Sequence, residues 1–408
     1  MTPAIAPRHF DVVVVGGGLA GQLTALALRT IAPARTVALV ERSPRLGSNT
    51  TWCCHRSDLK APWVGGAPLS AWFLALVDAR WPRHEVRFPR YRRVLDWEYL
   101  CLRSSSLAAR TEAALSQDGS RLFLGEAVSR VGRHEVGLES GGTLTAHLVL
   151  DARGLSAEAY EGRAGYQKFV GWEIDLSQPS ADFSAWPTLM DATVRQVDGF
   201  RFMYVLPFTA TRILVEDTVF SRRAGLDVEL FRARLQSYVA KRAGAPFRIL
   251  REESGVLPMP WSEPAHAVEA RDAGLAIGYR GRFFHPGTGY SLSRAALVAD
   301  RVAERVRDGN SSDLPRVCEK AMAALRAAWS PDDAFARRLN RLVFTWLPPT
   351  WLREMIFSPV YRLPESVLGG FYAGRTRLRD RLALATAPVR FSMFRPVAKP
   401  LSLLGGNP

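Results

Sequence analysis

The sequence predicts an α/β protein, and three features near its start carry that prediction. Phe10–Val15 is apolar and largely β-branched, as expected of a strand buried on both faces of a parallel sheet. A glycine-rich turn, Gly16–Gly21, follows it, and Leu23–Arg29 has apolar residues at helical spacing. Thr36–Val40 reads as a second buried strand that ends in Glu41. A strand, a turn, a helix and a strand in this order form a βαβ unit.

The turn Gly16-Gly17-Gly18-Leu19-Ala20-Gly21 matches the pattern G-x-G-x-x-G of dinucleotide-binding folds. Gly16 permits the tight turn, Gly18 lets the backbone approach a pyrophosphate, and Gly21 lets the helix pack close to the strand. The amides at the start of the helix, at Leu19 and Ala20, then face the phosphate charge. Glu41 follows twenty residues after Gly21 and can accept hydrogen bonds from ribose hydroxyls. A dinucleotide without a phosphate on that ribose is therefore predicted.

Two later features favour FAD over NAD as this dinucleotide. Arg42 and the loop Gly47–Trp52 extend past the second strand, as they often do in FAD folds. A glycine-rich segment, Gly278–Gly289, precedes a second predicted helix from Ser291 to about Arg307. Such a segment closes over the flavin in glutathione-reductase-like folds, and the helix start would stabilise a reduced, anionic flavin. The candidate cofactor-binding residues of this segment are Thr288, Gly289 and Tyr290.

The remaining elements alternate between strands and helices until the last hundred residues, which are mostly helical. We expect a helix at Leu107–Leu115, a loop at 44–52, and strands within Arg121–Val136, at Thr143–Ala152 and at Leu275–Ile277. Phe202–Leu206 and Arg212–Glu216 read as a hairpin joined by Pro207–Thr211, and the pattern from Pro315 onward is helical.

The chain of 408 residues is longer than one hydrophobic core usually spans, so we expect more than one part. The predicted FAD-binding domain, which is Rossmann-like, is discontinuous and takes residues 1–60, 101–165 and 266–310. A β-rich substrate domain takes 61–100 and 166–265, and 311–408 form a helical, basic C-terminal region.

Basic residues dominate the C-terminal region, in a chain whose net charge is +15. Residues 336–408 hold twelve Lys and Arg against three acidic residues. We expect this region to be either a solvated surface or a surface that contacts an anionic membrane. In the second case each basic residue contributes roughly 1 kcal/mol to the free energy of membrane binding. No nucleic-acid-binding motif accompanies the charge, so no nucleic acid is expected as a partner. Bulky apolar residues between the charges favour a lipid interface: Trp346, Leu347, Trp351, Met355, Ile356, Phe357, Phe371, Tyr372, Phe391, Met393 and Phe394.

Cysteine content and hydropathy argue against disulfides, a metal site and a transmembrane helix. The four cysteines are too few for a disulfide framework and lack metal-ligand spacing, so a reducing compartment and no metal are expected. No signal peptide is visible, and no run of about 18 apolar residues predicts a transmembrane helix.

A series of segments, in order along nearly the whole chain, resembles one family. The segments are Asn49-Thr50-Thr51-Trp52 with His55, Val86-Arg87-Phe88-Pro89, Asp151-Ala152-Arg153-Gly154, Met190-Asp191-Ala192-Thr193, Gly199-Phe200-Arg201-Phe202, Leu214-Val215-Glu216-Asp217-Thr218, Gly255-Val256-Leu257-Pro258 and Phe284-His285-Pro286 with Thr288-Gly289-Tyr290. They resemble the bacterial lycopene cyclases, flavoproteins that close ionone rings on the ends of lycopene. Thr50 stands where the family more often has His.

The resemblance implies an isomerase of carotenoid biosynthesis that converts lycopene to γ-carotene and β-carotene. The reaction is redox-neutral, and the resemblance implies reduced FAD with NADPH or NADH as reductant. Because lycopene and related carotenes dissolve in bilayers, we expect a cytoplasmic protein bound peripherally to the inner face of the cell membrane. The alternative is a flavin-dependent reductase or monooxygenase acting on an isoprenoid, although Gly278-Tyr279-Arg280 lacks the Asp expected of a hydroxylase. A non-catalytic protein that binds membranes or nucleic acid is a further alternative.

Glu216 is the first candidate for the acid–base residue. It follows the apolar stretch Ile213–Val215, and an apolar site would raise the pKa of its carboxyl and suit proton donation. The resemblance implies that the pair Glu216-Asp217 is the family's acidic motif; a surface carboxylate on a hairpin is the alternative. For Asp217 we expect one of two roles, orienting Glu216 or hydrogen-bonding to the backbone. For His285 we expect proton transfer, contact with the flavin or a structural role. Candidates for the apolar substrate wall are Tyr166, Phe169, Trp172, Phe200, Phe202, Tyr204 and Phe208.

Overall fold

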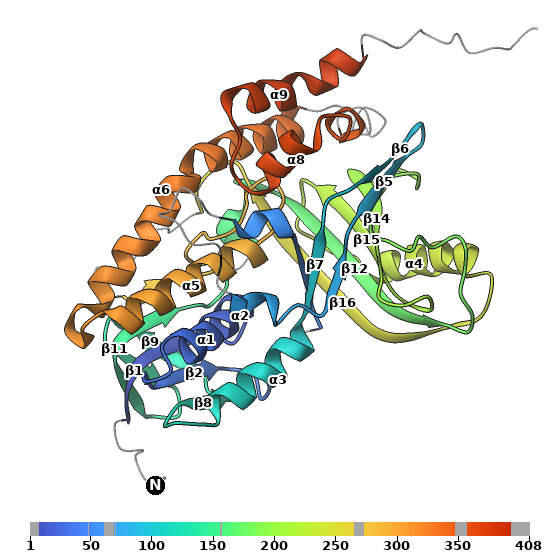
Figure 1. The fold of residues 1–408 in the computed structure, drawn as a ribbon. Coiled ribbons are helices and arrows are strands. Elements are labelled where there is room, and N and C mark those ends of the chain that lie inside the picture. The colour runs from blue at the N-terminus through green and yellow to red at the C-terminus, as the bar shows by residue number, and fades with distance from the viewer. Residues whose placement is uncertain are drawn as a thin grey trace, which may run out of the picture.

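The computed structural model describes residues 8–47, 49–60, 69, 71–155, 157–264, 273–346 and 357–392. Figure 1 shows two main sheets beside each other, the first in blue and teal and the second mostly in green and yellow, with β5 and β6 in blue at its edge. The C-terminal helices, in orange and red, run along the first sheet and across the region where the two sheets approach each other. The three parts therefore meet in the middle of the molecule.

The first sheet is built around strand β1 (Arg8–Val15), which pairs in parallel with β2 (Val37–Glu41) and β11 (Thr143–Asp151). The strand order is β8-β2-β1-β11-β10-β9, with β17 on β11. The outer strands are β8 (Arg121–Leu124), β9 (Val128–Val131), β10 (Glu135–Leu138) and β17 (Leu275–Ala276). Val12, Val13 and Val14 are fully buried, as a parallel strand covered on both faces requires.

Helices cover this sheet at the positions that the sequence predicts. They are α1 (Leu19–Ile31), α3 (Ser104–Leu115) and α5 (Leu292–Asp308). Leu23 of α1 and Val302 of α5 belong to one buried core cluster, which explains why both helices carry an apolar face. The predicted βαβ unit and the predicted late helix are confirmed.

The second sheet is mostly antiparallel, in the order β16-β12-β15-β14-β13-β5-β6. Its strands are β5 (His84–Phe88), β6 (Tyr91–Leu95), β12 (Ala164–Leu176), β13 (Thr188–Asp191), β14 (Phe200–Pro207), β15 (Arg212–Ser221) and β16 (Phe247–Pro260). Helix α4 (Val228–Ala243) packs on one face, where Phe231 and Leu235 join Trp172 and Val215 in a core cluster. The other face lies toward the middle of the molecule.

The predicted hairpin is confirmed, but its second strand is longer than expected. β14 and β15 are antiparallel neighbours, and β15 continues past Glu216 to Ser221. Glu216 therefore lies in the middle of a strand between two partners, not at the end of a hairpin. Its neighbours across the sheet are Tyr204 of β14 and Gly171 of β12.

A small sheet joins the two large ones. It contains β3 (Thr51–His55), β4 (Ala79–Trp81) and β7 (Tyr99–Arg103), in the order β3-β7-β4. The predicted loop at 44–52 is thus wrong at its end, because Thr51 and Trp52 pair with β7. Cross-strand pairing of β-branched and aromatic residues outweighs the turn-forming composition just before them. Short helices nearby are α2 (Ala71–Leu74) and the 3₁₀ helices Arg56–Leu59 and Ala157–Tyr160.

The C-terminal part is helical, as predicted. It contains the 3₁₀ turn Ser311–Asp313, α6 (Leu314–Arg341), the π-helical turn Leu342–Trp346, α8 (Glu365–Tyr372) and α9 (Leu378–Ser392). In the described ranges, none of the helices is long and apolar enough to cross a membrane. The residue ranges of the three predicted domains remain a prediction.

Candidate active site

In the glycine turn after β1, Gly16 and Gly21 have no room for a side chain, whereas the space beside Gly18 is empty. Gly16 has a φ of +106°, and a Cβ there would lie 3.0 Å from the carbonyl carbon of Ala152. A Cβ on Gly21 would lie 1.9 Å from the carbonyl oxygen of Gly16, so only glycine allows α1 to approach the strand. A Cβ on Gly18 would meet nothing within 4 Å. The open space at Gly18 fits a phosphate group of a bound dinucleotide.

The start of α1 and the end of β2 border this space. Leu19 and Ala20 begin the helix, whose first turn holds no acidic residue, so its free amides can stabilise an anion. Glu41 Oε2 accepts a hydrogen bond from the Gly17 amide at 2.6 Å. The structure thus brings Glu41 to the glycine turn. Arg42 beside it is exposed to solvent.

The late glycine-rich segment packs against the start of α1. Gly278 has a φ of +60°, and a Cβ there would lie 2.7 Å from the Cβ of Ala20. Further along, the Gly289 amide donates to the carbonyl of His285 at 2.8 Å, and Tyr279 Oη donates to the carbonyl of Gly289 at 2.6 Å. These bonds fix the loop that carries Thr288 and Tyr290 into α5. The predicted cofactor residues of both segments therefore lie in one region, which fits a dinucleotide that extends from Gly18 toward Tyr290.

A cavity of about 270 Å³ lies where the antiparallel sheet, this late loop and the C-terminal helices meet. The sheet contributes Phe169, Met190, Phe202, Tyr204, Phe220 and Leu257. The late loop contributes Thr288, Gly289 and Tyr290, and the C-terminal helices contribute Tyr361, Leu368, Phe371, Tyr372 and Leu384. The wall is mainly aromatic and aliphatic, so the cavity suits an apolar ligand.

Some predicted wall residues lie elsewhere. Trp172 points to the α4 side of the sheet, where its indole N–H donates to Glu252 at 2.9 Å. Tyr166, Phe200 and Phe208 are also not among the residues that line the cavity. Alternation along β12 turns Trp172 away from the face that carries Phe169. Phe200 shares a core cluster with Phe202 but stacks on Phe357, and Phe208 follows the end of β14 and packs beside Trp81.

Part of the tail predicted to face lipid lines the cavity. Phe357, Phe371 and Tyr372 belong to the wall, and Phe357 stacks on Phe200 with ring centroids 4.2 Å apart. For these three residues the cavity accounts for the apolar side chains, and contact of the tail with lipid stays a prediction. The remaining apolar positions of the tail, or their side chains, lie outside the described residues: Trp346, Leu347, Trp351, Met355, Ile356, Phe391, Met393 and Phe394.

Glu216 is the acidic residue that the structure brings to the cavity wall. Its side chain lies on the cavity face of β15 and the residue is 7% exposed. Burial raises the pKa of the Glu216 carboxyl well above its ordinary value, and a hydrogen bond with Glu253 raises it further. Arg251 opposes the shift but does not reverse it. A neutral carboxylic acid in an apolar cavity can donate a proton to a bound ligand.

Asp217 points away from the cavity, which corrects the expectation that it orients Glu216 or binds backbone. Its Oδ1 accepts from Nε of Arg201 at 2.7 Å, and Arg234 lies 3.9 Å from Oδ2. The residue has no solvent exposure. Burial raises the pKa of the Asp217 carboxyl, and the Arg201 guanidinium opposes that rise. Asp217 therefore belongs to an ion pair on the α4 side of the sheet.

His285 belongs to the late loop itself, but it is not among the residues that line the cavity. Its Nδ1 is 3.2 Å from Thr288 Oγ1, and its ring packs edge-on against Phe371 with centroids 5.0 Å apart. Burial lowers the pKa of His285 to about 3, so the imidazole is neutral at physiological pH. This geometry favours the structural alternative for His285.

Sequence reasoning missed Glu253 and Cys53, which act on Glu216, and Tyr99 in the cavity wall. Tyr99 Oη lies 3.0 Å from Tyr204 Oη and 3.2 Å from Tyr290 Oη, so the three phenols form a hydrogen-bonded group at the cavity wall. The signal available for Glu253 was its place just before the segment Gly255–Pro258, which itself resembles the family. Without strand pairing, nothing connects that position to Glu216.

Comparison with known proteins identifies the family of this chain. A family model described as "Lycopene cyclase protein" matches residues 11–398. The lycopene beta-cyclase of Pantoea ananas is 36% identical over 376 residues, which cover 92% of this chain and 94% of the relative. That of a Paracoccus species is 36% identical over 378 residues, with 92% of this chain and 93% of the relative covered.

Solved structures with low sequence identity show the fold. A geranylgeranyl bacteriochlorophyll reductase-like protein from Thermoplasma acidophilum has a TM-score of 0.61 at 13% identity, covering 93% of this chain and 96% of that chain. A flavin-dependent brominase has a TM-score of 0.57 at 16% identity, covering 95% and 99%. The predicted fold class, with its Rossmann-like domain, β-rich part and helical C-terminal part, is confirmed. The family model spans nearly the whole chain, and the alignments with the two bacterial relatives cover 92% of it. The chain therefore belongs to the lycopene cyclase family.

Proposed function

We propose that this protein is a lycopene β-cyclase that converts the linear ends of lycopene to β-ionone rings, giving γ-carotene and β-carotene. The observation that carries the proposal is the buried carboxyl of Glu216, whose pKa is raised by burial, in an apolar, aromatic cavity beside the cofactor loop. The reaction is an isomerisation that needs a proton donor and a dry, cation-tolerant site. Both requirements are met by residues of this chain.

Substrate binding rests on apolar contact, because a carotene has no polar group. Burial of apolar surface stabilises the bound state by roughly 25 cal/mol per Å². Phe169, Phe202 and Phe220 present their rings from the sheet, and Phe371 and Leu384 close the cavity from the helices. These side chains hold one end of the carotene and exclude water, which would otherwise capture a carbocation.

Proton transfer begins at Glu216. Its carboxyl gives a proton to the terminal double bond, the internal double bond attacks the resulting cation, and the ring closes. The Glu216 carboxylate then faces the cation and takes back a ring proton, so that no proton or electron is gained or lost. The π-faces of Phe202 and Tyr204 can stabilise the cation.

The cofactor proposal assigns FAD to the glycine turn and the late loop. Gly16, Gly18, Leu19, Ala20 and Gly21 would hold the pyrophosphate, and Glu41 with Arg42 would border the ribose. Thr288, Gly289 and Tyr290 would border the flavin. When bound in its reduced form, FAD supplies negative charge beside the developing cation. NADPH or NADH is the proposed source of its electrons.

Membrane contact is proposed through α9. Leu378 and Leu382 are 75% and 58% exposed and lie four residues apart, hence on one face of the helix. The exposed Arg377 and Arg379 flank Leu378, and Leu384 of the same helix lines the cavity. An apolar helix face with basic neighbours suits the anionic inner face of the cell membrane, from which a carotene can enter.

A double variant, Leu378→Gln with Leu382→Gln, tests this contact. We expect it to sediment less with anionic vesicles than the native protein does. Leu230→Gln on α4, where Leu230 is 45% exposed, is the matched control and should sediment as the native protein does. Unchanged sedimentation of the double variant would count against contact through α9.

The reaction itself is tested with purified protein, vesicles that contain lycopene, and chemically reduced FAD under anaerobic conditions. We expect cyclic carotenes of the same mass as lycopene, without stoichiometric consumption of the reduced FAD. In a parallel aerobic reaction with NADPH in place of the chemical reductant, a product whose mass differs from that of lycopene, formed with matching loss of NADPH, would identify a reductase or monooxygenase instead.

A further inference from the structure

Gly171 leaves a gap between two carboxyl side chains on the cavity face of the antiparallel sheet. In the strand register it lies opposite Glu216 of β15 on one side and Glu253 of β16 on the other. A Cβ on Gly171 would lie 2.6 Å from Glu216 Cγ and 3.3 Å from Glu253 Cγ. Because the middle strand has no side chain in this row, the two carboxyl side chains meet across it, and a hydrogen bond between them is one cause of the raised pKa of Glu216. Such a bond requires a proton on one of them.

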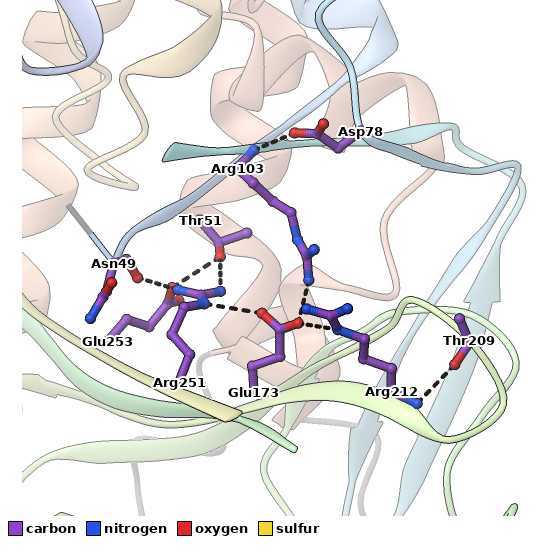
Figure 2. A network of polar contacts seen from close by, with 9 residues as sticks. All are labelled: Asn49, Thr51, Asp78, Arg103, Glu173, Thr209, Arg212, Arg251 and Glu253. Atoms are coloured by element: carbon purple, nitrogen blue, oxygen red, sulfur yellow. Dashed lines mark hydrogen bonds and ion pairs between the residues drawn. The ribbon is translucent and has the colours of Figure 1, made fainter. Parts of the chain in front are cut away.

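Thr51 and Arg251 hold the side chain of Glu253, as Figure 2 shows. Its Oε2 accepts from Thr51 Oγ1 at 2.9 Å and from Arg251 Nη1 at 2.5 Å. Its Oε1 is buried, and no N–H or hydroxyl group of the described residues donates to it. Glu216, on the other side of Gly171, is the group to which we assign that donor below. Thr51 and Arg251 hold Glu253 in place by donating to its other oxygen.

Arg251 does not cancel the effect of the second carboxylate on Glu216. Its guanidinium also bonds Glu173 at 3.0 Å and the carbonyl of Asn49, so its charge is shared (Figure 2). The ionisable groups that face Glu216 from neighbouring elements are Glu253 and Arg251 of β16, Cys53 of β3, Tyr204 of β14 and Tyr290 before α5. The two phenols are neutral at physiological pH, because burial raises the pKa values of Tyr204 and Tyr290.

We propose that Glu253 is a positioning residue that keeps the transferable proton on Glu216, so that the pair shares one proton before the reaction begins. The proposal deepens the proposed cyclase function and rests on it for the identity of the acceptor. Anchoring Arg251 is the purely structural alternative for Glu253. Glu173 and Asn49 already anchor that guanidinium, and the alternative does not explain why Oε1 of Glu253 is buried without a donor on the side of the strand that carries Glu216.

The charge of the pair then follows the course of the reaction. Before transfer the pair carries one negative charge, on Glu253. When the O–H bond of Glu216 breaks and a C–H bond forms on the carotene, the pair carries two negative charges beside one cation. When the ring loses its proton to Glu216, the pair returns to one negative charge. The repulsion between the two carboxylates favours this return and so completes the cycle.

The test compares Glu253→Gln with Glu252→Gln in the purified, FAD-loaded protein. Glu252 is its neighbour on β16 but points to the other face, where it pairs with Arg232 at 2.6 Å. The first readout is the infrared C=O band of a protonated carboxylic acid, followed as pH rises and assigned by its loss in Glu216→Gln. The second readout is the cyclisation rate as a function of pH.

We expect the acid band of Glu253→Gln to titrate at least about one pH unit lower than that of the native protein. The alkaline limb of its rate profile should move by the same amount, giving a roughly tenfold loss above the limb and little loss below it. Glu252→Gln should match the native protein in both readouts. An unmoved band and limb in Glu253→Gln, or an equal loss of rate at every pH, would overturn the proposal.

A second variant keeps both carboxyls. Gly171→Ala places a methyl group in the gap, and we expect it to lower the titration point of the acid band as Glu253→Gln does. If Glu253→Gln does not bind FAD, the Gly171→Ala titration decides, and an unchanged titration point refutes the shared proton. The infrared readout needs no turnover. If the native protein forms no rings, the cyclase proposal fails while the band still decides the pairing of Glu216 with Glu253.

Discussion

The two faces of strand β15 hold adjacent acidic residues in opposite surroundings. Glu216 points into the cavity, where its partner is another carboxyl, and Asp217 points toward α4, where its partner is Arg201. Both side chains are buried. The comparison teaches that burial alone does not make an acid catalyst. A carboxyl partner keeps the proton on the first acid, whereas a guanidinium partner favours the ionised form of the second.

Of the substitutions that test this comparison, Glu216→Gln should have the largest effect on the cyclisation rate. The amide keeps the shape of the side chain but has no proton to transfer, so the cyclisation rate should fall by about 10²- to 10⁴-fold. The measurement is the rate with reduced FAD at equal flavin content. Near-native activity of Glu216→Gln would contradict the role assigned to the cavity face.

Asp217→Asn probes the other face. Removing one partner of a buried ion pair leaves the Arg201 charge uncompensated, so the free energy of unfolding should fall by about 3 kcal/mol. Denaturant unfolding measures this change. The rate per folded molecule should stay near that of the native protein, because Asp217 does not reach the cavity. If the variant loses activity at unchanged stability, the separation of the two faces is incorrect.

The pH dependence of the free energy of unfolding tests whether the pKa of Glu216 is raised. The folded-state pKa of Glu216 is raised, so between the ordinary glutamate value of about 4.3 and the raised value the folded protein binds more protons than the unfolded chain. Relative to Glu216→Gln, the native protein should therefore lose up to about 1.4 kcal/mol of unfolding free energy per pH unit as pH rises through this window. Parallel stability curves for the two proteins would show that the pKa of Glu216 is not raised.

Tyr204→Phe is the mildest of these changes. It removes the hydroxyl that contacts Tyr99 at 3.0 Å but keeps the aromatic ring beside Glu216. A neutral hydrogen bond contributes about 0.5–1.5 kcal/mol, so we expect a two- to tenfold lower rate. The rate under the same conditions is the measurement. A loss as large as that of Glu216→Gln would mean that the phenol, not the carboxyl, holds the transferred proton.

Much of the cofactor region could be predicted from the sequence because its signals are local. Gly16, Gly18 and Gly21 act within one turn, and each has a distinct environment that a single residue type explains. The carboxyl pair could not be predicted in this way. Glu216 and Glu253 meet only through the register of two strands on either side of Gly171, and strand register is not readable from one sequence.

Two further differences have simple physical reasons. Neighbouring residues of a strand point to opposite faces, so the sequence alone already indicates that Asp217 lies on the face opposite Glu216 and does not orient it. The tail was harder, because an apolar cavity wall and a membrane surface require the same residues. Phe371 and Tyr372 could be assigned to the cavity only after α8 was placed against the late loop.

Pigment analysis in a bacterial host that accumulates lycopene tests the central claim most directly. The host expresses the native chain, Glu216→Gln or Asp217→Asn, and each protein is checked for folding and bound flavin. The account predicts β-carotene or γ-carotene from the native chain and from Asp217→Asn, and unconverted lycopene with Glu216→Gln. Unconverted lycopene with a folded, flavin-loaded native protein, or cyclic carotenes with Glu216→Gln, would contradict it.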